Sequence, residues 1–551
     1  MATGTHTFGL DETLIEPRVL EPPPTRHALL IFLVVLASIL HFGTAGWSAI
    51  QNGVEGYYAA AAQEMVHANT WAPPPPPESA AHDPPLVYWA TLASYKMLGP
   101  TASATRIPGA FAFVLCVALT FLIGERLAGY WRGFLAGLIQ LCWLGSFTWG
   151  RIATAEPLWS ACIAAAIYCA IRGYQQARHR RLWFAGVWAS VALACLTKGA
   201  YGFIYPAVVF LALALMFREA RLRLRLLLDW RYVGGFLLLI VPLYLWSPWN
   251  WFPPFGDDSA AAAEGLALPA FLGRNFAWWF PAVLLVIPGA LFGARKIFRP
   301  HEFEFADALP LCWAAVGFLP FLFFPGRHDY HTMSMWSALA LWIACAWQRT
   351  ERALRLAGIA FVAVVGCALA ASRFFAAAVD RSLLPAGLSL SALGAMPMLI
   401  GLGLAVACLV GGYFAWHHRE ELAIGAIMLA MVPIGLSAAE AMARFGSFFS
   451  FEDAASFLRP RLGESGQVLF EGRRNAASSL RFYLQRDPVM IDEDHAGSPD
   501  AALSAMAAPH PVYLIVHRDR VPYWQRHLTE RFHIYHQATT CGAYVVINND
   551  P

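Results

Sequence analysis

The residues from His27 to Trp47 read HALLIFLVVLASILHFGTAGW and include no Asp, Glu, Lys or Arg. A run of roughly 20 apolar residues is long enough to cross the hydrocarbon core of a bilayer as a helix. The run follows a polar leader and lacks a small-residue cleavage site, so we expect an uncleaved first span and not a removed signal peptide. This stretch places the chain among the membrane proteins.

The composition of the whole chain agrees with that interpretation. Hydrophobic residues make up 58% of the sequence and charged residues only 14%, which leaves too little polar surface for several soluble domains. The net charge of +3 arises from 39 basic and 36 acidic residues and does not indicate a nucleic-acid partner. Most of the 10 cysteines lie inside apolar runs without metal-ligand spacing, so we expect neither a disulfide framework nor a zinc site.

Apolar stretches of suitable length number about thirteen. Arginines gather in alternate connections, such as residues 172–181 and 218–231, whereas the remaining connections hold single basic residues. By the positive-inside rule the arginine-rich connections are cytoplasmic, which places the N-terminus in the cytoplasm and the C-terminal domain in the periplasm. The sequence therefore predicts an α-helical, multi-pass protein of the bacterial inner (plasma) membrane. The predicted spans centre near residues 38, 114, 141, 165, 189, 209, 239, 286, 316, 340, 363, 405 and 432.

We divide the chain into a cytoplasmic leader (1–27), a transmembrane domain (28–445) with an outer loop (48–100), and a soluble periplasmic α/β domain (446–551). In the last part helical and strand patterns alternate, which is typical of α/β structure. It lacks a glycine-rich phosphate loop, so we expect it to bind the acceptor or to support the fold. The predicted strands are 467–470, 489–491, 512–516 and 543–547, and the predicted helices are 453–458 (stopped by Pro460), 475–484 and 523–530.

The outer loop has parts of its own. Residues 55–65 predict a short alanine-rich helix along the membrane surface, with Tyr58, Ala62 and Met65 on one stripe. Residues 73–77 form a stiff polyproline stretch, and residues 82–89 (HDPPLVYW) open a second helix with aromatic side chains at the interface. These features alone fit an anchoring loop as well as they fit a functional one.

Charged residues stand at the ends of spans on the same predicted face. Glu156 opens the fourth span, Lys198 lies between two spans, and residues 327–331 (RHDYH) precede the tenth. Ionisable groups near hydrocarbon are usually paired or functional, although each one singly also fits a cap, a snorkelling end or a solvated loop. Acids can take a proton from an acceptor hydroxyl or hold a divalent cation, and Lys or Arg can neutralise a phosphate leaving group. Together they predict group transfer from a phosphate around a polar cavity.

At these residues the chain resembles the bacterial aminoarabinose transferase and protein O-mannosyltransferase superfamily, which are membrane glycosyltransferases of the GT-C fold. The resemblance implies thirteen spans, a periplasmic C-terminal domain, and transfer of a sugar from a polyprenyl-phosphate carrier to a lipid (lipid A-like) or protein acceptor. The matching pieces are Val54-Glu55 with Tyr58 and Glu64-Met65, Pro84 to Trp89, Glu156-Pro157, Thr197 to Gly199, and Arg327 with Tyr330.

The resemblance also implies roles for individual residues. Glu55 would help to activate the acceptor, Glu156 would hold a divalent metal ion or orient the site, and Lys198 and Arg327 would bind the carrier phosphate. The further residues expected to line the site are Tyr58, Asp83, His328, Asp329 and Tyr330.

Two positions depart from the family pattern. Val54 stands where the family has an aspartate, and Asp83 stands where it has a lysine. These departures predict a different substrate, a shifted catalytic arrangement, or an inactive scaffold of the same fold. A transporter or flippase of polyprenyl-linked intermediates is the other alternative, but it would place ionisable residues in mid-span and show internal repeats. Ionisable residues at span ends on one face favour the enzyme.

Overall fold

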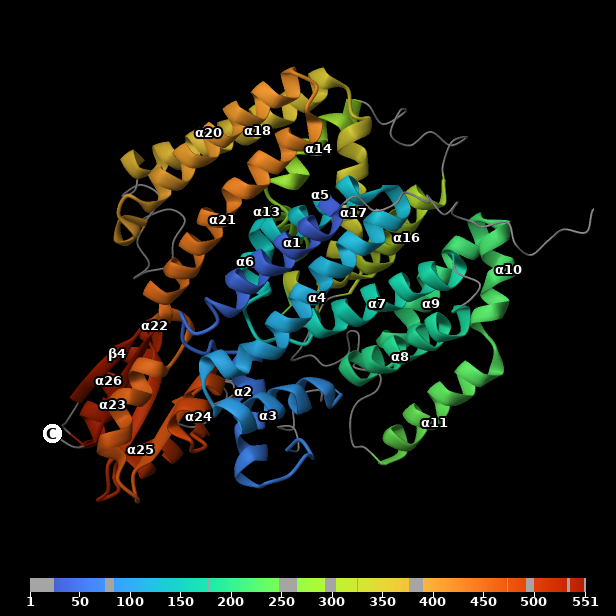
Figure 1. The fold of residues 1–551 in the computed structure, drawn as a ribbon. Helices are drawn as coiled ribbons and strands as arrows, with labels where there is room; N and C mark the ends of the chain where they lie inside the picture. Colours follow the sequence, from blue (N-terminus) through green and yellow to red (C-terminus); the bar gives the residue numbers. More distant parts are fainter. Residues whose placement is uncertain are drawn as a thin grey trace, which may run out of the picture.

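The computed structural model describes residues 24–74, 84–175, 179–246, 265–292, 304–324, 326–375, 390–472, 474–491, 500–532 and 536–549 (Figure 1). The prediction of a mostly helical chain with several apolar helices is confirmed. The helices that precede the C-terminal sheet, in the first half of the chain, are α1 (Pro24–Phe42), α2 (Val54–His67), α3 (Leu86–Leu98), α4 (Ala102–Ala128), α5 (Tyr130–Cys142), α6 (Leu144–Trp149), α7 (Glu156–Gln175), α8 (Arg180–Lys198), α9 (Tyr201–Met216), α10 (Arg218–Leu227) and α11 (Trp230–Trp246).

The helical part continues in the second half of the chain and includes short 3-10 turns. Its helices are α13 (Leu268–Trp278), α14 (Ala282–Phe292), α16 (Phe305–Phe318), α17 (Trp336–Arg349), α18 (Arg352–Ala371), α20 (Met396–Trp416), α21 (Glu420–Arg444) and α22 (Gly446–Phe449). The 3-10 turns of this part are η2 (Leu319–Leu322), η3 (Asp329–Met335), η4 (Ser372–Phe375) and η5 (Leu390–Leu393).

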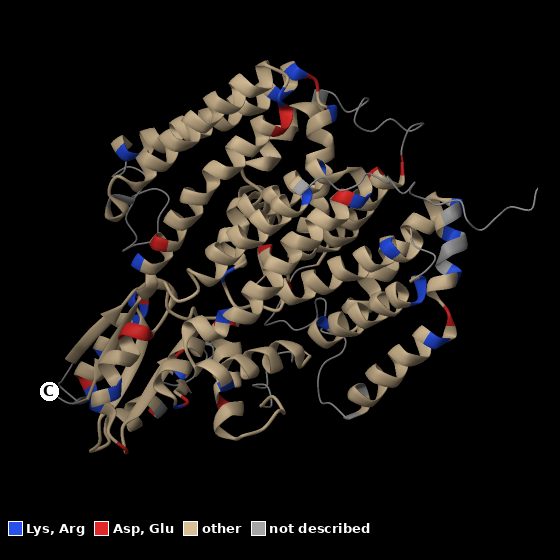
Figure 2. Cartoon of the chain, in the orientation of Figure 1, with Lys and Arg blue, Asp and Glu red and all other residues tan. Residues whose placement is uncertain are grey.

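Among the described residues, 6 helices are long and apolar enough to cross a membrane, or up to 7 if the bent pair α13 and α14 forms one broken span. Each predicted span centre lies on a helix of its own. Several of these helices are shorter or less apolar than a full span, so the count of thirteen stays a prediction. Charged residues are sparse along the helices and concentrate at their ends and in the C-terminal domain (Figure 2).

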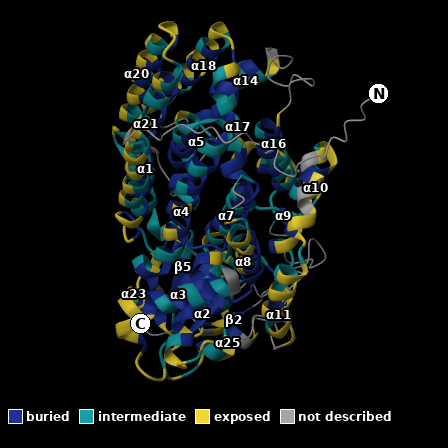
Figure 3. Cartoon of the chain, turned by 45° about the vertical axis from the view of Figure 1, so that its right-hand side comes forward, coloured by how far each residue is buried: buried dark blue, intermediate teal, exposed yellow. Residues whose placement is uncertain are grey.

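The outward faces of the long helices are apolar. Leu238 on α11 and Leu409 on α20 are among the large side chains exposed there, and Figure 3 shows exposed positions along the outer helices around a buried centre. A large exposed apolar surface is typical of helices that face lipid. Inside, α4 and α5 approach closely at Gly124 and Gly133, because a Cβ added at Gly124 would lie 2.7 Å from the Cα of Gly133. Small residues permit such close backbone contacts between membrane helices.

The C-terminal domain contains a five-stranded sheet in the order β2-β1-β3-β5-β4. The pairs β1–β2 and β1–β3 are parallel, whereas β5 is antiparallel to both β3 and β4. The strands are β1 (Gln467–Glu471), β2 (Val489–Ile491), β3 (Val512–His517), β4 (His536–Cys541) and β5 (Tyr544–Asn548). The helices and turns around them are α23 (Glu452–Leu462), η6 (Arg474–Ala477), α24 (Ser478–Leu484), α25 (Asp500–Met506), η7 (Arg518–Arg520) and α26 (Val521–Phe532).

Two local predictions for this domain are wrong. Helix α23 does not stop at Pro460 but runs on to Leu462, because a proline in the last turn removes only its own N–H bond and the helix ends directly afterwards. Strand β4 was not predicted. Its sequence, HQATTC, is polar because the strand lies at the edge of the sheet, with most of its side chains only partly buried.

The outer loop forms two helices near the predicted places, and α2 is largely enclosed by protein. It packs between α3 and α24 of the C-terminal domain, and most of its side chains are buried (Figure 1). Tyr88 is likewise fully buried against Tyr58 and is not part of an interfacial belt. Asp83, residues 75–77 of the proline run, and most of the leader lie outside the described residues.

Candidate active site

A cavity of about 830 Å³ lies between α2, α7, α8, α9, α16 and the η2–η3 segment. Much of its wall is apolar, and part of that wall reaches the outer surface, where Ile204, Val208, Leu319 and Phe323 are exposed. The polar side chains on its wall are Tyr58, Glu156, Lys198, Tyr330 and His331, together with the tyrosines of α9. The cavity therefore joins a lipid-like surface to a small set of polar and charged groups.

The ion pair of this cavity joins Glu156 and Lys198. Glu156 is the first residue of α7 and Lys198 is the last residue of α8, and the two helices pack against each other. A short connection between antiparallel helices brings the start of one beside the end of the next, and the lysine Nζ lies 3.0 Å from Glu156 Oε1. The carboxylate is buried, whereas the lysine side chain keeps 18% of its surface exposed. An ammonium group is thus held at the cavity wall.

The η3 segment adds aromatic rings to the same wall. The ring of Tyr330 lies 4.8 Å from Trp149, 5.2 Å from His328 and 4.6 Å from His331. Burial lowers the pKa of His331 well below its usual value, and the positive charge of Lys198 acts in the same direction. The imidazole is therefore neutral, and Lys198 supplies the positive charge among the described cavity residues.

Glu55 does not occupy the position that the sequence led us to expect. Its carboxylate oxygens accept hydrogen bonds from Arg106 Nε and Nη2 at 2.8 and 2.9 Å, and from the backbone N–H groups of Gln51 and Ala153 at 2.8 and 2.9 Å. It is buried and is absent from the cavity wall, which Val54 and Tyr58 form on this side. The geometry gives Glu55 an anchoring contact between α2 and α4 in place of a contact with an acceptor.

Arg327 and Asp329 are not part of the cavity wall either. Arg327 Nε donates to the carbonyl of Phe324 at 2.6 Å, and the side chain is not part of the cavity wall. Asp329 is buried and accepts a hydrogen bond from Trp278 Nε1 at 2.7 Å. These two residues hold the η3 segment in place, while Tyr330 and His331 of the same segment reach the cavity. Asp83 is not described.

The described residues do not fit a divalent metal ion. Within them no group of three or more His, Cys, Asp or Glu side chains could hold one. The carboxylate proposed as a ligand, Glu156, already has the ammonium group of Lys198 at 3.0 Å, and a positive charge there repels a second cation. The expectation of a metal at Glu156 is therefore not carried further.

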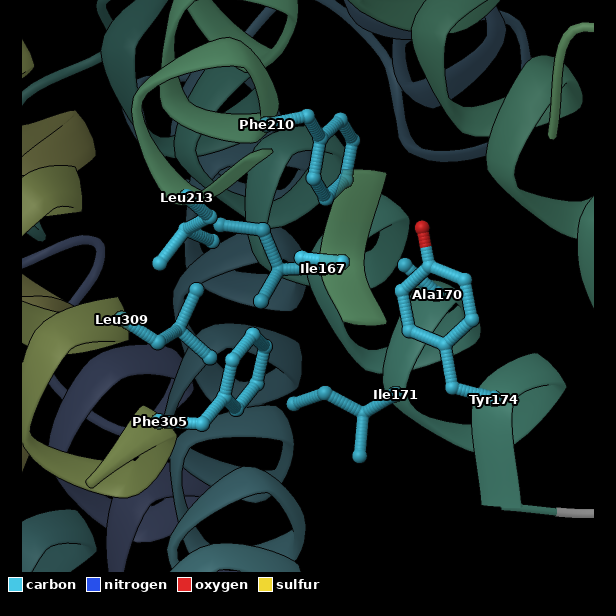
Figure 4. A pocket seen from close by; sticks show the side chains of 9 residues that line it. Ile167, Ala170, Ile171, Tyr174, Phe210, Leu213, Phe305 and Leu309 are labelled. Atoms are coloured by element: carbon cyan, nitrogen blue, oxygen red, sulfur yellow. The ribbon is translucent and has the colours of Figure 1, made fainter. Parts of the chain in front are cut away.

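A second hollow lies between α7, α9 and α16 (Figure 4). It is lined by apolar side chains such as Ile167, Phe210 and Leu309, and its volume is about 10 Å³. That is room for about one water molecule. The hollow is a packing gap and not a binding site.

The most informative residue that the sequence analysis missed is Arg106, in the second turn of α4. Its guanidinium donates to the carbonyls of Ala45, Ser48 and Ala49 at 2.7, 2.7 and 2.8 Å as well as to Glu55. An arginine near the start of an apolar span is itself a signal, because an ionisable group at that depth needs a partner.

Known proteins match the chain in sequence and in fold. Residues 82–246 match the family model described as dolichyl-phosphate-mannose-protein mannosyltransferase, a segment that contains Glu156 and Lys198. The chain is 25% identical over 315 residues to undecaprenyl phosphate-alpha-4-amino-4-deoxy-L-arabinose arabinosyl transferase 1 of Sodalis glossinidius (strain morsitans). That match covers 52% of this chain and 53% of the relative.

The structural match extends further along the chain. The crystal structure of ArnT from Cupriavidus metallidurans bound to undecaprenyl phosphate superposes with a TM-score of 0.74 at 17% identity, and covers 95% of this chain and 98% of that one. The chain is similar to sugar transferases of the GT-C superfamily over part of its sequence, and it shares the fold of ArnT. The resemblance stated from the sequence is confirmed.

A further relative of this chain is an uncharacterized protein of Aquifex aeolicus (strain VF5). It is 29% identical over 227 residues, which are 41% of this chain and 42% of that protein. The chain matches about half the length of these curated relatives or less. The similarity therefore concerns the architecture and part of the sequence, and the substrates of this chain need an argument from its own residues.

Proposed function

We propose that this protein is a membrane glycosyltransferase of the GT-C type that transfers a hexosyl or pentosyl group from a polyprenyl-phosphate carrier to a lipid or protein acceptor. The observation that carries the proposal is a single cavity in which the Glu156–Lys198 pair meets an apolar wall that opens outward. A polyprenyl phosphate has both matching parts, an apolar chain and an anionic head. The similar fold of ArnT, whose crystal structure is described as bound to undecaprenyl phosphate, supports the same class of carrier.

The chemistry assigned to the cavity is a displacement at the anomeric carbon. The acceptor oxygen forms a bond to that carbon while the bond from carbon to the carrier phosphate breaks, and the phosphate leaves with the electron pair. Lys198 stabilises the negative charge that develops on the leaving phosphate. Where the acceptor is a hydroxyl, its proton passes to Glu156, the acidic side chain on the described cavity wall. Glu156 also fixes the position of the Lys198 ammonium group.

Two of the residues selected from the sequence have smaller parts in this proposal. Arg327 follows Gly326 of the cavity wall and is assigned to the rim, where its charge adds to the attraction of the carrier phosphate. Glu55 acts indirectly, because its contacts with Arg106 and Ala153 hold the start of α2 beside the start of α7.

The proposal places the reaction on the periplasmic side of the bacterial inner membrane, with lipid A-like molecules or protein hydroxyls as acceptors. In support, α10 carries several arginines, as a cytoplasmic connection does under the positive-inside rule. Figure 2 shows α10 far from the C-terminal domain, which is assigned to the opposite side. Labelling of single cysteines at exposed sites of α10 and of the C-terminal domain in intact and permeabilised spheroplasts tests this orientation.

A transfer assay tests the activity. Vesicles containing the full chain receive a polyprenyl-phosphate sugar that is radiolabelled in the sugar, together with lipid A or periplasmic protein. We expect the label to appear on the acceptor and unlabelled polyprenyl phosphate to accumulate. Label that crosses the bilayer with the sugar–phosphate bond intact would indicate a flippase, and an intact carrier on its original side would indicate a scaffold. Lys198→Met and Lys96→Met serve as the test variant and the matched control, because Lys96 lies on α3 outside the cavity wall.

A further inference from the structure

The start of α2 forms part of the cavity wall and is at the same time bound to the C-terminal domain. Val54, the first residue of α2, and Tyr58, one turn later, line the cavity. Gly53 caps the helix and precedes Val54 directly. Whatever holds Gly53 therefore sets the position of the cavity side chains that follow it.

Ser478, the first residue of α24, makes that contact. Its Oγ accepts a hydrogen bond from the N–H of Gly53 at 2.8 Å and donates to the carbonyl of Gly53 at 3.0 Å. The hydroxyl thus satisfies a backbone donor and a backbone acceptor at the N-terminus of α2, where the helix itself supplies no partner for the first N–H groups. The two segments are 425 residues apart in the sequence.

Neighbouring residues strengthen the same junction. Ser479 Oγ donates to Asn52 Oδ1 at 2.6 Å, and the hydroxyl of Tyr483 accepts from the N–H of Ile50 at 2.8 Å. Burial raises the pKa of Tyr483 to about 12, so this hydroxyl stays neutral at physiological pH. The segment that leads from α1 into α2 is thus bound by three side chains from two turns of α24 and also by Arg106 of α4.

The packing at Gly56 shows how closely the two helices fit. A Cβ added at Gly56 would lie 2.6 Å from Ser478 Oγ and 2.7 Å from the backbone nitrogen of Ser479. Neither neighbour is the far end of a long side chain, so a methyl group at this position would force α2 and α24 apart. The C-terminal domain is therefore closely packed against the helix that forms this part of the cavity wall.

We propose that Ser478 is a positioning residue: through Gly53 it fixes the cavity face of α2, so that the C-terminal domain sets the distance between Val54 and Tyr58 on one wall and Glu156 and Lys198 on the other. The inference rests on the proposed transfer reaction. It assigns to the C-terminal domain a part in the geometry of the site without requiring that the domain touch a substrate. A misplacement of about 1 Å is enough to slow a reaction that depends on aligned groups.

The test compares two variants that disturb the junction from opposite sides. Ser478→Ala removes the hydroxyl, and Gly56→Ala adds the methyl group that the junction cannot accommodate. In the vesicle assay we expect each variant to lower kcat by about tenfold, with the KM for the carrier within about twofold, because the residue assigned to the carrier phosphate, Lys198, lies on α8 and not on α2. A loss of global stability would also lower the apparent kcat at an unchanged KM, so kcat is expressed per folded molecule, with the folded fraction measured from thermal unfolding in detergent.

Matched controls separate the junction from general effects of the substitutions. Ser504→Ala removes a hydroxyl of the same domain that bonds only within α25, and Gly425→Ala adds a methyl group to α21 where it meets nothing within 4 Å. Both controls should transfer at the unmodified rate.

A second readout does not depend on activity. Hydrogen exchange of the backbone amides of residues 50–58, followed by mass spectrometry on the full chain, should be at least about fivefold faster in both variants than in the controls. If the unmodified chain transfers nothing, the proposed function is wrong. The exchange rates would still show whether Ser478 holds residues 50–58 in place. Transfer and exchange at unmodified rates in Ser478→Ala, or in Gly56→Ala alone, would overturn the positioning role.

Discussion

Two ion pairs with buried carboxylates lie near the start of α7, and they differ in what surrounds them. In the pair of Glu55 and Arg106 both side chains are almost fully buried, and the arginine donates to three backbone carbonyls besides the carboxylate. In the pair of Glu156 and Lys198 the lysine remains partly exposed on the wall of a large cavity. An ion pair that is enclosed by protein stabilises the fold, whereas an ion pair at a cavity wall can be reached by a ligand.

Removal of Arg106 should have the largest effect, which is a loss of stability. Arg106→Met leaves the Glu55 carboxylate and three carbonyls buried without their donor, and breaking one side of a buried pair costs about 3–5 kcal/mol. We expect a large loss of folded protein and a clearly lower thermal unfolding midpoint in detergent. Arg444→Met is the control, because Arg444 forms an exposed pair within one helix. Equal midpoints for both variants would contradict the structural role.

Removal of Lys198 should affect mainly the chemistry. Lys198→Met keeps the length of the side chain but removes the charge opposite the leaving phosphate, and a preorganised group of this kind contributes about 10²–10³-fold to rate. We expect transfer to fall by about that factor, and the unfolding midpoint to fall less than in Arg106→Met, because only the Glu156 carboxylate loses its cation and that pair lies at the cavity wall. Lys96→Met should transfer normally.

Substitution of the two glutamates should separate the two pairs, because one variant should lose activity and the other stability. Glu156→Gln removes the proposed proton acceptor and loosens the hold on Lys198, so transfer should fall by about 10²-fold. Glu55→Gln should instead lower the unfolding midpoint and leave the transfer rate per folded molecule within a few fold. If Glu55→Gln abolished transfer in a stable protein, the result would support the role predicted from the sequence, in which Glu55 helps to activate the acceptor.

The smallest expected effect concerns His331. Its pKa in the folded protein is well below the usual value, so below about pH 6.5 the unfolded chain binds a proton that the folded chain does not. The free energy of unfolding should therefore fall as the pH drops below about 6.5, by about 1 kcal/mol at pH 5.5 from this group. His331→Gln should reduce the decrease in the unfolding midpoint between pH 7.5 and 5.5. An unchanged decrease would show that His331 is not buried as a neutral group.

Much of the architecture could be predicted from the sequence, because apolar length and charge placement are local signals. The span centres, the two outer-loop helices and the proximity of Glu156 and Lys198 all follow from such signals. The face that α2 turns to its neighbours could not be predicted. That face depends on α24, which lies more than 400 residues away in the sequence and contributes small polar side chains such as Ser478 and Ser479.

The site shows the same limit. Motif order singled out Glu55, but the side chain at the cavity is its neighbour Val54, since one step along a helix turns a residue by about 100°. The position where the chain departs from the family pattern is therefore the one that reaches the cavity. The acid retained next to it serves the fold through Arg106.

The most direct test of the central claim measures binding of the carrier head group. Purified chain in nanodiscs is titrated with undecaprenyl phosphate and with undecaprenol, which lacks the phosphate, and bound lipid is counted by native mass spectrometry. The unmodified chain and Lys96→Met should prefer the phosphate strongly, and Lys198→Met should bind the two lipids about equally. A Lys198→Met variant that kept the full preference for the phosphate would contradict the assignment of this cavity to a polyprenyl-phosphate carrier.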